Sequence, residues 1–160
     1  PNRLFERSDL VEYIHEAVTH FGVPHAAIEL EITETGLMKD LQNVIPSLHR
    51  LNEIGVQISI DDFGTGYSSL AYLTTLPISE LKLDMAFVQD LTTSATARAL
   101  TVSVLSIAHS LGMVVVAEGV ETVQQRDLLL SAGCDFGQGY LFAAALPVAE
   151  FEAYCRSATR

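Results

Sequence analysis

Segments with two different hydrophobic periodicities alternate along this chain, and that alternation limits the folds open to it more than any other feature. Short apolar or alternating runs predict strands, at 28–33, 56–61, 81–84, 113–118 and 135–139. Runs with an apolar residue every three to four positions predict helices, at 10–20, 41–53, 67–76, 95–111, 122–131 and 148–157. Strand–helix repetition of this kind predicts an α/β fold with a parallel sheet, either doubly wound or part of a (β/α)₈ barrel.

Composition and charge bound the class of protein. The chain has 160 residues, of which 49% are hydrophobic, so we expect a single folded domain over 1–160. No apolar run approaches the roughly 20 residues of a membrane-spanning helix. We expect a cytoplasmic location, although further domains could tether the protein to a membrane. The formal net charge of −11 argues against binding duplex nucleic acid, which requires clustered Lys and Arg.

Two adjacent acids, Asp61 and Asp62, follow directly on the predicted strand at 56–61, and a turn containing Gly64 and Gly66 comes next. Neighbouring carboxylates repel each other and are costly to desolvate unless a cation or a proton compensates them. A divalent cation is the simplest solution, and hard oxygen ligands favour Mg²⁺ or Mn²⁺ over Zn²⁺. The alternative is that the two acids only cap a helix.

Further polar residues occur at or near the carboxyl ends of the other predicted strands. Together with Asp61 they are Glu31, Lys82, Glu118 and Gln138. Ligands bind at this end of the sheet in both candidate folds. We therefore expect these side chains to converge on one rim.

Five segments closely resemble the EAL domain family, in the same order and at compatible spacings: 29–34, 61–70, 81–84, 116–122 and 138–142. The similarity extends from about residue 5 to residue 154. It implies a TIM-like barrel that hydrolyses the bacterial messenger cyclic di-GMP to linear pGpG with two Mg²⁺ or Mn²⁺ ions. The resemblance thus implies a phosphodiesterase that acts in second-messenger signalling.

The resemblance also implies roles for individual residues. Glu31 resembles a ligand of the first metal ion, Asp61 the bridging carboxylate and Asp62 a ligand of the second ion. Glu118 is similar to the acid at the second ion, which acts as ligand or proton acceptor. Lys82 resembles the lysine beside the attacking water and the phosphate.

Three more residues match supporting positions of the family. Gln138 and Asp84 resemble residues on the substrate-binding side of the site. Glu34 matches a glutamate that steadies the loop after Asp62, a loop that the family also uses for dimerisation and activity control. The resemblance therefore implies a homodimer through that loop, and fused or associated sensory or GGDEF domains.

Two family motifs are missing from these residues: the early Glu-Ala-Leu strand and the Val-Asn-x-Ser strand, whose asparagine is another metal ligand. We therefore expect a partial barrel that lacks about the first three strands, an N-terminally truncated EAL domain. Exposed sheet edges would make this piece poorly soluble or self-associating, with little or no turnover by itself.

Two other functions compete with the enzyme hypothesis. A degenerate EAL domain would bind cyclic di-GMP as an effector without hydrolysing it. The intact acids and Lys82 argue against that alternative. A purely structural interaction module would leave the acid pair at Asp61 and Asp62 unexplained.

Overall fold

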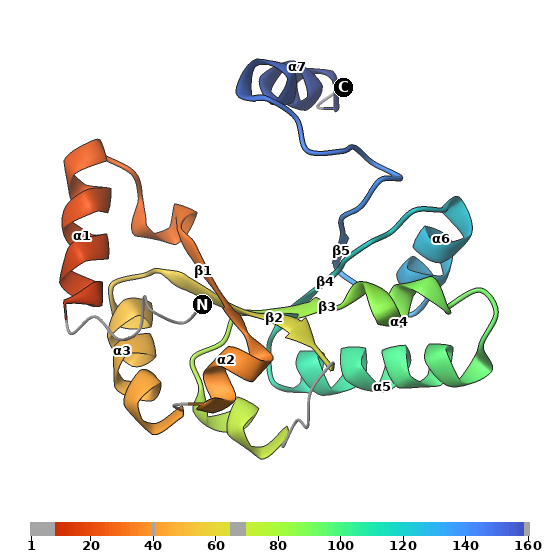
Figure 1. Cartoon of the computed structure of the whole chain (residues 1–160), viewed down its shortest axis with the longest axis horizontal. Helices are drawn as coiled ribbons and strands as arrows, with labels where there is room; N and C mark the ends of the chain where they lie inside the picture. Colours follow the sequence, from red (N-terminus) through yellow and green to blue (C-terminus); the bar gives the residue numbers. More distant parts are fainter. Residues whose placement is uncertain (1–8, 40, 65–69, 159–160) are drawn as a thin grey trace.

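Five parallel strands form one sheet in which the spatial order equals the order along the chain, as the computed structural model shows (Figure 1). The structure describes residues 9–39, 41–64 and 70–158. Its strands are β1 (Glu29–Thr33), β2 (Gln57–Phe63), β3 (Glu80–Leu83), β4 (Val114–Ala117) and β5 (Phe136–Gly137). A doubly wound sheet reverses its strand order at a switch point, whereas a barrel does not. The observed order is therefore that of a partial (β/α) barrel, which confirms the predicted fold class.

Five helices correspond to predicted helical segments: α1 (Leu10–Phe21), α3 (Leu41–Glu53), α5 (Ala95–Ser110), α6 (Val123–Ser131) and α7 (Val148–Ala158). In the predicted segment 67–76, residues 67–69 lie outside the described residues, and Leu70–Thr75 forms the 3₁₀ helix η3. A further 3₁₀ turn, η2, spans His25–Ala27. None of the helices in the described part of the chain is long and apolar enough to cross a membrane.

Two short helices were not predicted, and both directly follow strands. Helix α2 (Glu34–Lys39) begins at the residue after β1, and α4 (Met85–Gln89) begins two residues after β3. The side chain of Asp84 caps α4 by accepting a hydrogen bond from the backbone N–H of Ala86. Strands β1 and β3 therefore each lead directly into a short helix at the rim where the polar residues gather.

The sheet has one apolar face and one polar face. Ile58 and Ile60 of β2 and Leu81 of β3 are fully buried in the hydrophobic core, as are leucines of α3 and α5. Because side chains alternate along a strand, the residues between them, such as Ser59, point to the opposite face. The apolar face fixes the sheet against its helices, and the opposite face carries the polar residues that the sequence singled out.

Helix α7 follows an extended segment after β5, and Figure 1 shows it separated from the sheet by that segment. Three of its large apolar side chains, Val148, Phe151 and Tyr154, are exposed. The hydrophobic core is formed instead by β1 to β4 together with residues of α1 to α6.

Helix α5 offers a matched test of where the core lies, because it carries one buried and one exposed leucine. Leu105 is 1% exposed and Leu100 is 53% exposed. We expect Leu105→Ala to lower the free energy of unfolding by about 2–5 kcal/mol, since it removes core contacts and leaves a cavity. Leu100→Ala should change it by less than about 0.5 kcal/mol. Urea unfolding followed by circular dichroism measures both, and equal losses would contradict the described core.

Candidate metal-binding active site

The ammonium group of Lys82 on β3 joins carboxylates from three neighbouring elements. Its Nζ lies 2.9 Å from Glu31 Oε1 on β1, 3.5 Å from Asp61 Oδ1 on β2 and 2.9 Å from Glu118 Oε1 after β4. The Lys82 side chain is only 10% exposed. The acids therefore converge on one rim of the sheet, as predicted from the strand ends.

This arrangement keeps Lys82 charged. Burial by itself lowers the pKa of a lysine, because it penalises the charged form. Hydrogen bonds to Glu31 and Glu118, with the nearby charge of Asp61, outweigh burial and raise the pKa of Lys82 above its ordinary value. Lys82 is thus a fixed positive charge at neutral pH.

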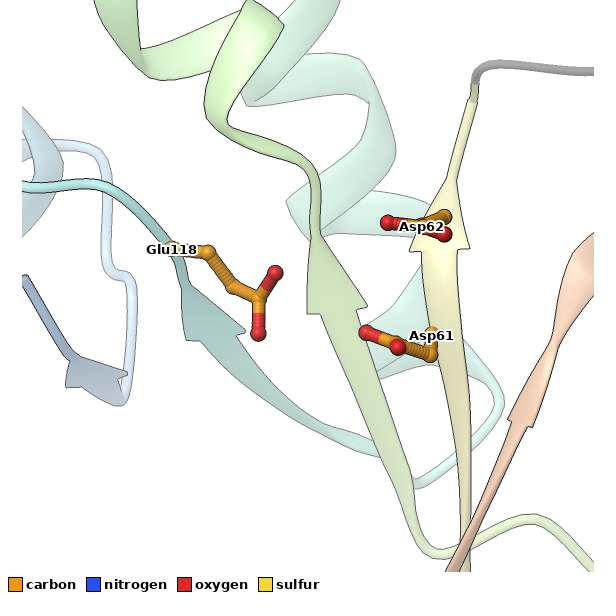
Figure 2. A group of neighbouring side chains, drawn as sticks. All are labelled: Asp61, Asp62 and Glu118. Carbon is orange, nitrogen blue, oxygen red and sulfur yellow. The ribbon is translucent and has the colours of Figure 1, made fainter.

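Three carboxylates form a compact group next to this lysine. Ligand atoms of Asp61, Asp62 and Glu118 all lie within 4.8 Å of one another. Figure 2 shows Asp61 and Glu118 pointing towards each other across β3, with Asp62 one residue further along β2. Glu31 reaches the same rim through its contact with Lys82 rather than as a member of this group.

The backbone of β2 explains how two consecutive acids serve one site. Neighbouring residues in a regular strand point to opposite faces. Asp62 departs from regular geometry, with a left-handed φ of 55°, and the pairing register between β2 and β3 shifts between Ile60 and Phe63. Aspartate tolerates this conformation better than most residues, and irregular strand ends of this kind re-aim side chains. The bend brings both carboxylates to the rim.

The three-carboxylate group fits a divalent cation. Burial is the largest influence that raises the pKa of Asp62, and the negative charges of Asp61 and Asp84 add to it. The ammonium of Lys82 opposes this effect only in part. A cation bound between the carboxylates would relieve the remaining repulsion, and oxygen donors suit Mg²⁺ or Mn²⁺.

Gln138 and Asp84 lie beside the acids but make different contacts. Gln138 Nε2 donates a hydrogen bond to Glu118 Oε1 at 2.6 Å, so it orients that carboxylate directly. Asp84 Oδ1 accepts a hydrogen bond from the N–H of Ala86 at 2.8 Å, which occupies one oxygen in capping α4. Both residues, with Asp62 and Glu118, line a cavity of about 760 Å³. A cavity of this size accommodates a ligand as large as a nucleotide.

Glu34 holds the chain immediately after the acid pair. Its side chain is buried, and Oε2 accepts a hydrogen bond from the N–H of Gly64 at 2.9 Å. Gly64 has a left-handed φ of 94°, and a Cβ at this position would collide with the ring of Phe87 from α4. Glu34 thus contacts the start of the loop after Asp62, while residues 65–69 of that loop lie outside the described residues.

A second acid pair, Glu29 and Glu80, lies nearer the start of β1 and β3 on the same face of the sheet, and the sequence analysis missed it. Glu29 and Glu80 precede Glu31 and Lys82 by two residues, so they share their face. Burial, followed by the charge and hydrogen bond of Glu29, raises the pKa of Glu80 to about 7. The alternation of β1 and β3 contained the signal, since it places all four residues on one side.

Comparison with known proteins places this geometry in a family. The sequence model of the EAL domain matches residues 1–145. The chain is 44% identical over 151 residues to the cyclic di-GMP phosphodiesterase NbdA of Pseudomonas aeruginosa, a match that covers 94% of this chain and 19% of NbdA. The chain thus spans about a fifth of the length of that relative.

Solved structures agree with the sequence match. The PaMucR phosphodiesterase in complex with c-di-GMP superposes with a TM-score of 0.89 at 36% identity, covering 94% of this chain and 61% of that one. A manganese and cyclic di-GMP complex of BlrP1 from Klebsiella pneumoniae superposes with a TM-score of 0.83 at 34% identity, covering 88% and 36% of the two chains. These structures are EAL-type barrels, so the partial barrel described above is part of that fold.

The Glu29–Glu80 pair gives the folded state a defined pH dependence. Because the folded pKa of Glu80 is about 7 and its ordinary value is 4.5, the folded protein keeps a proton between these pH values that the unfolded chain releases. Stability should therefore fall as pH rises from 4.5 to 7. Glu80→Gln removes the titrating group, so its stability relative to the unchanged protein should be greater at pH 8 than at pH 5.

Urea unfolding at both pH values, in buffer free of divalent ions, measures this difference. Glu53→Gln, at an exposed position on α3, is the control for the loss of one negative charge. An equal difference between Glu80→Gln and the unchanged protein at both pH values would show that Glu80 does not titrate as described.

Proposed function

We propose that this chain, which belongs to the EAL domain family, carries the site at which a longer protein hydrolyses cyclic di-GMP to linear pGpG. The observation that supports this function best is the single buried lysine held among Glu31, Asp61 and Glu118. A phosphodiester is anionic, so a hydrolytic site must offer positive charge to it. At this rim Lys82 supplies one positive charge, and the carboxylate oxygens around it can bind metal cations that supply more.

Each residue of the rim has a distinct task in this proposal. Lys82 directs its ammonium group at the phosphate as a fixed point charge. Glu118 Oε1 is held by Lys82 and Gln138, at 2.9 Å and 2.6 Å, so the orientation of this carboxylate is set before substrate arrives. Its Oε2 is then the oxygen with which Glu118 can bind an ion or accept a proton from water.

We propose two Mg²⁺ or Mn²⁺ ions, with Asp61 shared between them, Asp62 and Glu118 at the second ion and Glu31 at the first. When bound, such ions neutralise the phosphodiester and activate a water molecule. The compact group of Asp61, Asp62 and Glu118 supports the second ion. Manganese in the BlrP1 complex supports the choice of metal. The proposal takes the remaining ligands of the first ion from the missing family strands.

The cavity beside the carboxylates supports a nucleotide substrate. Its lining combines the carboxylates of Asp62 and Glu118 with apolar groups such as Met85 and Tyr140. A nucleotide has charged phosphates and bases with flat apolar faces, so it needs polar and apolar lining in the same cavity. Cyclic di-GMP, the ligand of the PaMucR complex, meets that requirement.

The proposal also includes a homodimer through the loop after Asp62, fused sensory or GGDEF domains, and a cytoplasmic location. The hydrogen bond from Gly64 to Glu34 supports a regulatory role for the loop, since it links the loop to the end of β1. The small share of NbdA that this chain covers is consistent with additional domains.

A second candidate function is binding of cyclic di-GMP without hydrolysis. The observation that favours it is that the compact carboxylate group in the described residues accounts for one ion rather than two. Measurements of both product and binding separate the two functions.

The first test is hydrolysis of cyclic di-GMP with Mn²⁺ by the full-length protein that carries this chain, with pGpG measured by chromatography. We expect Asp61→Asn to lower the rate by roughly 100-fold or more, because it removes the charge that the ions share. Glu53→Gln, far from the rim on α3, should leave the rate unchanged. Tight calorimetric binding without pGpG would establish the effector function instead.

The second test is removal of metal. Chelation with EDTA should abolish hydrolysis, and added Mn²⁺ or Mg²⁺ should restore it. Mn²⁺ should also stabilise the folded protein, by about 2.7 kcal/mol at a concentration of 100 times its Kd. In Asp61→Asn this stabilisation should be strongly reduced in thermal unfolding measurements. Hydrolysis that persists in EDTA would contradict a metal-dependent site.

A further inference from the structure

Gln125 on α6 is a buried polar residue with more partners than a helix cap needs. Its side chain is 7% exposed. Oε1 accepts hydrogen bonds from the N–H groups of Glu121 and Thr122, both at 2.9 Å. Nε2 donates to the carbonyl oxygen of Val88 at 3.2 Å, across 37 residues of sequence.

Only part of this set belongs to the cap of α6. In a capping box the first residue and the residue three positions later bond to each other's backbone, as Thr122 and Gln125 do here. The bond to Val88 lies outside that motif, because it reaches a different helix, α4. A glutamate could accept from Glu121 and Thr122 equally well, but an ionised carboxylate cannot donate to Val88.

The two segments that Gln125 joins both lie close in sequence to active-site residues. Helix α4 starts three residues after Lys82, and the loop to α6 starts at Glu118. The loop contacts α4 a second time at Gly119, whose left-handed φ of 68° brings it against Met85. A Cβ on Gly119 would come within 2.6 Å of the Cβ of Met85.

The contacts of Gly119 and Gln125 are made to the same side of α4. Met85 and Val88 are three residues apart on α4, and therefore lie on one side of that helix. Gly119 meets the first and Gln125 meets the second, so the loop is fastened to α4 near its start and at its end. Below this junction the backbones of β3 and β4 pair up to Leu83 and Ala117, and the Glu118 N–H donates to the carbonyl oxygen of Leu83 at 3.0 Å.

We propose that Gln125 is a positioning residue for the reaction: through Val88 it locks α4 to the loop after Glu118 and so sets the Lys82–Glu118 geometry. This inference rests on the proposed function. Lys82 Nζ and Glu118 Oε1 are 2.9 Å apart, a contact that lengthens if the loop moves relative to α4. Displacement of a catalytic group by about 1 Å can cost up to about 100-fold in rate.

The test compares two substitutions in the same cap, made in the full-length protein. Gln125→Glu keeps the acceptor for Glu121 and Thr122 but loses the donor to Val88. Thr122→Ala removes the other half of the capping box and leaves the bond to Val88 in place. Gln125→Glu therefore keeps the cap bonds and loses the bond to α4, whereas Thr122→Ala weakens the cap and keeps the bond to α4.

We expect Gln125→Glu to lower kcat about tenfold with KM changed by less than about twofold, and to weaken calorimetric Mn²⁺ binding about threefold or more. Thr122→Ala should lower Tm while kcat, KM and Mn²⁺ binding stay unchanged. If the buried carboxylate prevents folding, the uncharged Gln125→Met takes its place. It loses the cap bonds as well as the bond to Val88, so we expect it to lose more kcat than Thr122→Ala at a comparable loss of Tm.

Two results would overturn the inference. One is a kcat loss in both variants that follows their loss of Tm, which would make Gln125 a structural cap only. The other is unchanged kcat and Mn²⁺ binding in Gln125→Glu. Failure of the proposed function is distinct from both, since the unchanged protein would then produce no pGpG, while Mn²⁺ binding would still report on Gln125.

Discussion

One buried ammonium group holds the rim of this sheet together. Lys82 contacts carboxylates of β1, β2 and the segment after β4 while it is itself anchored on β3. Carboxylates this close repel one another unless a positive charge lies among them. Lys82 therefore holds the acids in place and offsets part of their negative charge. The other features of the site, including the cap at Asp84 and the amide of Gln138, add orientation to that arrangement.

The sequence was most informative where periodicity was long and clearly ended. Helix α3 was predicted with the bounds it has in the structure, because its apolar face repeats over three turns and Gly55 follows it. The parallel sheet followed from the alternation of elements. Helices α2 and α4 were not predicted, because they have only six and five residues, too few to show a hydrophobic period. The choice between a doubly wound sheet and a barrel needed either the family resemblance or the observed strand order.

The candidate site could be predicted in its residue types but not in its backbone geometry. Strand ends identified Glu31, Lys82 and Glu118, since parallel strands bring their carboxyl ends to one edge. Regular alternation, however, would have sent Asp61 and Asp62 to opposite faces, and only the left-handed φ of Asp62 brings them together. Such a conformation costs of order 1–3 kcal/mol and persists only where the surroundings enforce it. The bond from Gln125 to Val88 could not be predicted either, because a sequence motif can indicate a helix cap but not a hydrogen-bond partner 37 residues away.

The strand order has a consequence for synthesis on the ribosome. Because each of β2 to β5 pairs with the strand before it in the chain, the sheet can grow one strand at a time as residues leave the ribosome. Glu31 and Asp61 are made before the lysine that compensates them, and Glu118 comes last of the four. A nascent chain therefore passes through a stage in which its acids lack their counter-charge. Dissolved cations can compensate these acids until β3 is added.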